Sequence, residues 1–343
     1  MSPDGPGLPR LPAGCTARTP DPAADAPALD AVLAAFAARY AAPHSQPAAQ
    51  ALGRLGASLR DGGAAVLVDH RDGGTAGPAA LAWVDVRDRA RDTDREPTLA
   101  LDVRVAPPHT GPLEAPLVTW CLDRVRQWLA ADGRAAVRVE SDPHREDRAT
   151  TAAMAGAGLV HDRTYWRMER PHPAAGSDAG SGAPPGVTVR RVTDDTGRRL
   201  VHRLWLTSFA DHHGFEPLGF DEWWTRWERR GGTDLTQWWV ADLDGEPVGH
   251  CIGDARLATL DGGYVRSLGV DPAARGRGVA RHLLGLAFAE HVRRGWTFTQ
   301  LFVDAGNETG ATQLYRSVGM VPVEVKDEYA ARIVAEPTTR VPS

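Results

Sequence analysis

The segment Arg275-Gly-Arg-Gly-Val-Ala280 places glycines and arginines just ahead of an apolar helical pattern. Glycines leave backbone N–H groups unobstructed, and the first amides of a helix have no partner within the helix. Together with the helix dipole, such a turn favours a pyrophosphate or another anion. Arg275, Arg277 and Arg281 add positive charge at the same place. A glycine-rich turn with solvated arginines is the alternative interpretation.

This turn lies between an expected strand and an expected helix. Tyr264–Val270 is an apolar run that Pro272 ends, because proline has no N–H to donate to a sheet. From Val279 to Phe288, apolar residues recur at helical spacing. The strand-turn-helix context favours an anion site over a solvated turn. A dinucleotide site would need a third glycine, and a P-loop would need Gly-Lys-Ser/Thr, so the sequence argues against both.

Two stretches rich in proline and glycine, 1–14 and 170–186, divide the chain of 343 residues. Neither shows apolar periodicity, and the blocks that they separate have the usual size of a domain. We therefore expect a disordered head (1–14), a first domain (15–169), a linker (170–186), a second domain (187–334) and a tail (335–343).

Both blocks show the same order of expected elements, which indicates a duplicated domain with a mixed α/β sheet. In the first block, strands are expected at 64–69, 79–86, 98–105, 136–139 and 164–168, and helices at 117–129 and 150–155. In the second, strands are expected at 187–192, 238–243, 247–252, 264–270 and 299–303, helices at 279–288 and 308–318, and a closing hairpin of 321–325 with 328–333.

The turn resembles a motif of the GCN5-related N-acetyltransferase (GNAT) family, R/Q-x-x-G-x-G/A, which Arg275, Gly278 and Ala280 meet. Leu268-Gly-Val270 is similar to the splayed strand of that family, whose backbone binds the pantetheine arm. The resemblance implies an α/β fold of two tandem GNAT-like domains, each a mixed, mostly antiparallel sheet flanked by helices. It also implies acetyl-CoA, or another acyl-CoA, as co-substrate, bound by Leu268, Gly269, Val270, Arg275, Gly276, Arg277, Gly278, Val279, Ala280, Arg281 and Asn307.

The downstream segment Leu301–Met320 supplies two residues that the resemblance singles out. Asn307 stands where the family has an asparagine that contacts the cofactor, and Tyr315 where it has the tyrosine that protonates the CoA thiolate. Asn307 as a helix N-cap and Tyr315 as a core aromatic are the plainer alternatives. We expect Tyr315 to be the catalytic acid.

The first block differs at the matching positions. Its turn, Val105–Ala115, contains prolines that remove N–H donors a pyrophosphate would need. Met154 stands at the position of Tyr315, and Glu146 at that of Asn307. We therefore expect the first domain to have lost acyl-CoA binding and catalysis.

A tandem arrangement with intact motifs in the second half is similar to mycothiol synthase and related tandem GNAT proteins. Leu268–Ala274 and Val325–Ala330 carry this likeness. Mycothiol synthase has a glutamate on the strand before Leu268, at the place where this chain has Tyr264. This difference argues against assigning the substrate of mycothiol synthase to this chain, and it leaves the general base unassigned.

Candidates for the base lie in the region that borders the acceptor in GNAT proteins. A histidine there takes up a proton near neutral pH, although surface residues and helix caps are the alternative interpretation. The candidates are Asp211, His212, His213 and Glu216. Nearby, the helical spacing of Trp223, Trp224 and Trp227 predicts a core role for some of these rings and an aromatic wall for others.

Composition argues against several other classes of protein. Cys15, Cys121 and Cys251 are far apart, which disfavours a disulfide framework and a cysteine metal site. A net charge of -5 gives no reason to expect nucleic acid as a partner. Apolar runs of membrane-spanning length and a secretory pattern are both missing from the sequence. We expect a cytoplasmic protein with no metal and no membrane partner.

Together the patterns predict an N-acyltransferase that moves an acetyl or other short acyl group from acyl-CoA to the primary amine of a small molecule. Transfer is expected to be direct, in a ternary complex, because no cysteine lies in the motifs to form an acyl-enzyme. An acyl-CoA-binding regulatory module without turnover and a protein or peptide N-acetyltransferase stay open as alternatives. The acceptor, the acyl length and the oligomeric state are not predicted.

Overall fold

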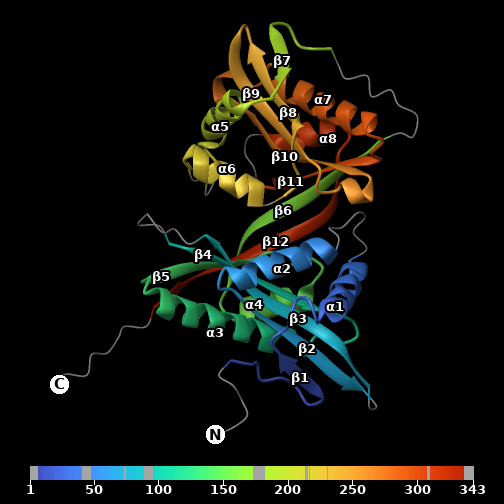
Figure 1. The fold of residues 1–343 in the computed structure, drawn as a ribbon, viewed down its shortest axis with the longest axis vertical. Coiled ribbons are helices and arrows are strands. Elements are labelled where there is room, and N and C mark those ends of the chain that lie inside the picture. The colour runs from blue at the N-terminus through green and yellow to red at the C-terminus, as the bar shows by residue number, and fades with distance from the viewer. Residues whose placement is uncertain are drawn as a thin grey trace, which may run out of the picture. The chain divides into compact units, whose positions relative to one another are not determined.

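The computed structural model describes residues 7–40, 48–72, 75–88, 96–172, 182–212, 215, 217–229, 231–306 and 310–335. The chain forms two compact units. Unit 1 consists of Met1–Tyr165 together with Val325–Ser343, and unit 2 consists of Trp166–Glu324. Each unit is a sheet with helices on both faces, so the expected mixed α/β architecture is confirmed (Figure 1).

The sheet of unit 1 has the strand order β1-β2-β3-β4-β5-β12-β6. The pairs β1–β2, β2–β3, β3–β4 and β5–β12 are antiparallel, and β4–β5 is parallel. The helices α1 and α2 cover one face of this sheet, and α3 and α4 the other. The elements are β1 (Cys15–Arg18), α1 (Ala26–Arg39), α2 (Ala48–Arg60), β2 (Ala64–Asp72), β3 (Thr75–Asp88), β4 (Thr98–Val105), α3 (Glu114–Asp132), β5 (Ala136–Ser141), α4 (Arg148–Gly156) and β6 (Val160–Pro171).

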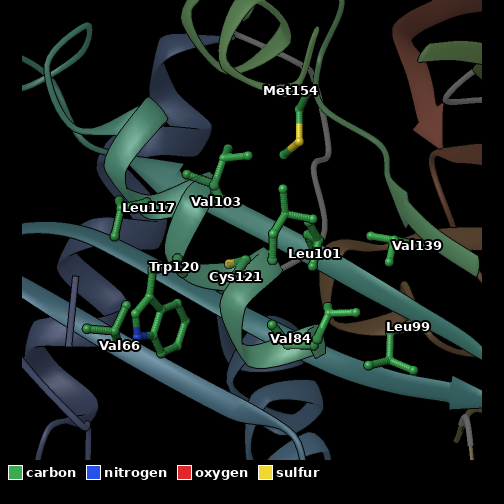
Figure 2. Packing of buried hydrophobic residues seen from close by; sticks show 14 of the residues in the cluster. Val66, Val84, Leu99, Leu101, Val103, Leu117, Trp120, Cys121, Val139 and Met154 are labelled. Atoms are coloured by element: carbon green, nitrogen blue, oxygen red, sulfur yellow. The ribbon is translucent and has the colours of Figure 1, made fainter. Parts of the chain in front are cut away.

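The larger core of unit 1 lies under α3 and α4. Leu101 and Val103 of β4 pack there with Cys121 of α3. Figure 2 shows the Met154 side chain pointing from α4 toward Leu101 and Val103, and Met154 is fully buried. The position that corresponds to Tyr315 is therefore a packing position in unit 1, with no polar atom to offer a substrate.

The sheet of unit 2 has the order β12-β6-β11-β10-β9-β8-β7. The pairs β7–β8, β8–β9 and β9–β10 are antiparallel, and β10–β11 is parallel. The helices α5 and α6 pack on one face, and α7 and α8 on the other. The elements are β7 (Val187–Arg191), α5 (Asp195–Phe209), α6 (Phe220–Arg229), β8 (Thr233–Leu243), β9 (Glu246–Asp254), β10 (Gly262–Val270), α7 (Val279–Arg293), β11 (Phe298–Asp304), α8 (Ala311–Ser317) and β12 (Val321–Val334).

Two strands pass from one unit into the other, so the units differ from the contiguous domains that the sequence predicts. From Trp166 on, β6 belongs to unit 2, where Glu169 accepts a hydrogen bond from Gln300 of β11. From Val325 on, β12 belongs to unit 1, where its residues 329–334 pair with residues 141–136 of β5. Each sheet is therefore completed by a strand that lies far away in the sequence.

Three further details differ from the sequence-based expectation. The closing hairpin expected at 321–333 is wrong, because β12 is one continuous strand. The helices α1 and α2 were not predicted, although their apolar residues fill a core of their own. In the expected disordered head, the carbonyl of Gly7 accepts a hydrogen bond from the Trp120 indole, so residues from Gly7 on have a defined place against α3.

Cutting the chain between His172 and Gly182 removes β12 from the first fragment and β6 from the second. We expect each fragment alone to lose its cooperative thermal unfolding, because an open sheet edge and part of the core are exposed in each. Circular dichroism should show a sharp transition again when the two fragments are co-expressed. Sharp transitions in both isolated fragments would show that the exchanged strands are dispensable.

Candidate active site

In unit 2, β10 and β11 pair along only part of their length. Their parallel register ends at Tyr264 and Gln300, whereas β10 continues to Val270 and β11 to Asp304. The other edge of β10 stays paired with β9 as far as Val270. The last residues of β10 therefore have one edge that β11 does not cover, at the place where the resemblance implies a splayed strand.

A β-bulge in β10 decides which side chains face which helices. Its register with β9 shifts between Val265 and Ser267, so one extra residue enters the strand. As a result, Leu268 and Val270 pack with the core under α7 and α8. Ser267 and Gly269 face α5 instead. Without the extra residue the two faces would be exchanged, because side chains alternate along a strand.

The end of β10 leads through a short turn to the N-terminus of α7, as expected for the anion site. Gly276 and Gly278 have φ angles of 76° and 80°, a left-handed conformation that other residues rarely adopt. Gly278 is the N-cap of α7, where no side-chain cap is found among the described residues and the first turn holds no acidic residue. The first amides of α7 can therefore bind an external anion.

The three arginines of this turn have different roles, which the sequence did not distinguish. Arg275 donates to Val270 O (3.3 Å) and to Ser208 O (3.2 Å), so it ties the end of β10 to the end of α5. Arg281 donates to the carbonyl and the hydroxyl of Ser317, at the end of α8. Arg277 is exposed, and no bond joins it to another described residue. Arg277 is thus the arginine whose charge is available to a ligand.

Tyr315 lies in α8, two residues before the serine that Arg281 holds. Its side chain is buried in the cluster that contains Cys251, Leu268 and Leu301. Burial raises the pKa of Tyr315 above its ordinary value, and Cys251 and Tyr264 raise it further. The hydroxyl therefore stays protonated at neutral pH, as a donor to a leaving thiolate must. A core position for Tyr315 is therefore compatible with the role of acid that the sequence predicts.

His212 lies half-buried at the end of α5, with its ring 4.5 Å from that of Phe209. Burial lowers the pKa of His212, and the charge of Arg275 lowers it further, against the opposing effects of Asp211 and Asp304. Asp211 is exposed, whereas the other expected residues, His213, Glu216 and Asn307, lie outside the described residues.

Of the three neighbouring tryptophans, Trp223 and Trp227 are buried between α6 and the sheet, so the predicted core role is confirmed for both. Trp224 is half-buried, and the Arg198 guanidinium lies 4.4 Å above the centre of its ring. The aromatic group thus fixes α6 on the sheet beside the site.

Sequence reasoning missed two histidines of unit 2 that are fully buried, His250 and His291. His250 on β9 lies with Nε2 2.9 Å from Ser267 Oγ. His291 on α7 lies with Nδ1 2.6 Å from Thr299 Oγ1 and with Nε2 3.1 Å from Gln237 Oε1. Burial is the main cause that lowers the pKa of each histidine to about 3. The apolar run at residues 247–252 predicts a strand that contains His250. No sequence pattern indicates that Ser267 is its hydrogen-bond partner.

The turn before α3 is the counterpart in unit 1. Glu114 begins α3, is 1% exposed, and accepts a hydrogen bond of 2.7 Å from the backbone N–H of Gly111. The residue at the matching position in unit 2 is Val279. In unit 1, a carboxylate of the protein itself therefore occupies the N-terminal end of the helix, which attracts negative charge.

Residues 198–320 match the model of the acetyltransferase (GNAT) family. A solved structure of a GCN5-related N-acetyltransferase from Sphaerobacter thermophilus is 28% identical, with 96% of this chain and 98% of that chain covered and a TM-score of 0.74. The second half of the chain thus matches the GNAT family model, and the chain as a whole is similar to a solved GCN5-related N-acetyltransferase. A tandem GNAT protein from the clavulanic acid biosynthesis pathway shares the fold at 14% identity, with 94% and 99% covered and a TM-score of 0.64.

Among curated relatives, the mycothiol acetyltransferase of Thermobispora bispora is 31% identical over 202 residues, which are 57% of this chain and 61% of that protein. The mycothiol acetyltransferase of Beutenbergia cavernae is 29% identical over 181 residues, or 50% and 60% of the two chains. The match thus spans about three fifths of these relatives.

Within the described part of the chain, no helix is long and apolar enough to span a membrane.

The buried histidines predict how stability depends on pH. Their folded-state pKa of about 3 lies below the ordinary 6.5, so between these values the unfolded chain binds protons that the folded chain does not. The free energy of unfolding should be highest above about pH 6.5 and should fall as the pH drops toward 3. Urea unfolding at pH 7, 6 and 5 measures this decline, and His291→Gln should make it shallower. An equally steep decline in His291→Gln would exclude His291 as a cause.

Proposed function

We propose that unit 2 is an N-acyltransferase that moves an acetyl or other short acyl group from acyl-CoA to the primary amine of a small molecule. The observation that carries this proposal is the continuity of the uncovered edge of β10 with the N-terminus of α7. The amide groups of a pantetheine arm can pair with an open strand edge, and a pyrophosphate suits uncapped helix amides. One short stretch of chain offers an open strand edge followed by uncapped helix amides. In CoA the pantetheine arm and the pyrophosphate follow each other in the same order.

The residues of this stretch would divide the binding between them. The backbone of Leu268, Gly269 and Val270 would bind the pantetheine arm, and the turn from Gly276 to Ala280 the pyrophosphate. Arg277 would add positive charge near the pyrophosphate. Arg275 and Arg281 would keep the turn in place through their bonds to β10, α5 and α8. Asn307 is proposed as a contact on the strength of the motif. No group of three metal-ligating side chains occurs among the described residues, and this proposal uses no metal.

The transfer would be direct. The neutral amine attacks the thioester carbon and forms the C–N bond, the C–S bond breaks, and Tyr315 gives its proton to the departing thiolate. The nitrogen passes its extra proton to solvent, from which the tyrosine is reprotonated. An acyl-enzyme is disfavoured because Cys251 is fully buried and burial raises its pKa to about 12.

A small-molecule acceptor is supported by the two curated relatives described above, which are both mycothiol acetyltransferases. For unit 1 we propose that no acyl-CoA binds. Glu114 supplies the negative charge that a pyrophosphate would supply, and a second anion at the same helix end would meet electrostatic repulsion.

Gly278→Glu should abolish acetyl-CoA binding, because it places a carboxylate at the N-terminus of α7. Isothermal titration calorimetry should find one acetyl-CoA per wild-type chain and none per variant chain. Gly295→Glu is the matched control: Gly295 has a φ of 78° beyond the other end of α7, so the strain of about 1–2 kcal/mol is similar. Two molecules bound per wild-type chain would contradict the proposal for unit 1, and binding that survives in Gly278→Glu would contradict the anion site.

Tyr315→Phe should lower kcat about 100-fold, since a positioned general acid contributes at least that much. The affinity for acetyl-CoA should stay almost unchanged, because the ring and its packing remain. Steady-state kinetics that follow CoA release, combined with calorimetry, separate the two effects. Tyr329→Phe, which removes a hydroxyl in unit 1, is the control and should leave kcat unchanged. If Tyr315→Phe turns over at the wild-type rate, Tyr315 has only a packing role.

A further inference from the structure

We propose that the Ser267 hydroxyl donates a hydrogen bond to the thioester oxygen during acyl transfer, and that His250 is the positioning residue that holds this hydroxyl. The inference rests on the function proposed above and deepens it, because it names the group that stabilises the charge formed on that oxygen. It follows from the place of Ser267, the state of His250 and the packing around Gly269.

Ser267 stands where such a donor is needed. It follows the last parallel pair, Tyr264 with Gln300, and it directly precedes Leu268 on the edge that β11 does not cover. The bulge turns its side chain to the face opposite the core that contains Tyr315. A substrate carbonyl on this stretch of β10 would thus have the acid on one face of the sheet and the serine on the other.

The state of His250 determines what Ser267 can offer. His250 is fully buried, and its burial lowers the pKa to about 3, so the imidazole is neutral and carries one N–H. Its Nδ1 has no hydrogen-bond partner among the described residues, and a buried N–H without a partner is costly. The hydrogen therefore belongs on Nε2, which donates to Ser267 Oγ at 2.9 Å. The serine keeps its own O–H free for a substrate.

The packing around Gly269 holds this pair rigidly. A Cβ at Gly269 would lie 2.5 Å from His250 Cε1 and 2.2 Å from Ser208 Oγ, so α5 and the imidazole press directly against the backbone of β10. Arg275 fixes the same end of α5 through its bond to Ser208 O. A donor held in this way needs no reorganisation when charge develops, which is the condition for strong electrostatic stabilisation.

In the transfer step, the amine lone pair forms the C–N bond while the π electrons of the carbonyl move to its oxygen. The Ser267 O–H stabilises that oxygen and keeps its proton. When the C=O bond forms again, the C–S bond breaks, the thiolate receives the Tyr315 proton, and the ammonium proton goes to solvent. His250 stays neutral throughout, because its buried site disfavours a positive charge.

The test combines kinetics with nuclear magnetic resonance on the full chain. Ser267→Ala should lower kcat about 100-fold, the cost of one lost oxyanion donor, with acetyl-CoA affinity and the KM of the amine almost unchanged. His250→Leu should have a similar effect, and His250→Gln, whose amide can donate in place of Nε2, should recover most of the rate. Thr207→Ala, which removes an exposed hydroxyl of α5, is the control. The ¹⁵N spectrum of His250 should show the Nε2–H tautomer.

Three results would overturn the assignment. The first is an Nδ1–H tautomer of His250 in the folded wild-type protein, which the spectrum shows whether or not an acceptor is known. The second is a normal kcat in Ser267→Ala, or a defect confined to the KM of the amine. The third is an equal loss in His250→Gln and His250→Leu in proteins that both unfold cooperatively. If the wild-type chain binds acetyl-CoA but acylates no amine, the proposed function fails, and the role of Ser267 falls with it.

Discussion

Parallel pairing between β10 and β11 stops at Tyr264 and Gln300, and the rest of the site depends on this interruption. A strand edge with unpaired backbone groups is costly inside a protein, so it persists only where its surroundings hold the strand in place. Here β9 holds the other edge, the bulge sets the orientation, and Arg275 joins the strand end to α5. The result is a rigid surface of backbone donors and acceptors that a ligand can complete.

The two units show what the same scaffold does with different charges at one helix end. In unit 1 the parallel pairing of β4 with β5 also stops early, at Ala100 and Glu140. Both units therefore share a parallel strand pair that separates before its ends. The first turn of α3 in unit 1 contains the acidic residue Glu114, whereas the first turn of α7 in unit 2 contains no acidic residue. Local electrostatics separate the two halves more than topology does.

Much of this could be predicted from the sequence, because the signals were local. Alternation along strands, the helical spacing after Val279 and the glycines of the turn need only neighbouring residues. The strand exchange could not be predicted, since β6 and β12 have the same pattern whichever sheet they join. Nor could the separate roles of Arg275, Arg277 and Arg281, because the partners of two of them are backbone carbonyls that the fold brings near. The His250–Ser267 pair depends on a bulge that leaves no mark in the composition.

The exchanged strands also impose an order on synthesis. β12 leaves the ribosome after the other strands that the structure describes, yet it completes the sheet of unit 1, whose other described strands are made first. The sheet of unit 1 therefore cannot be completed until unit 2 has been translated, and the edge of β5 stays unpaired until then. Tandem domains usually fold one after the other as they emerge. In this chain, the half that is made first is finished last.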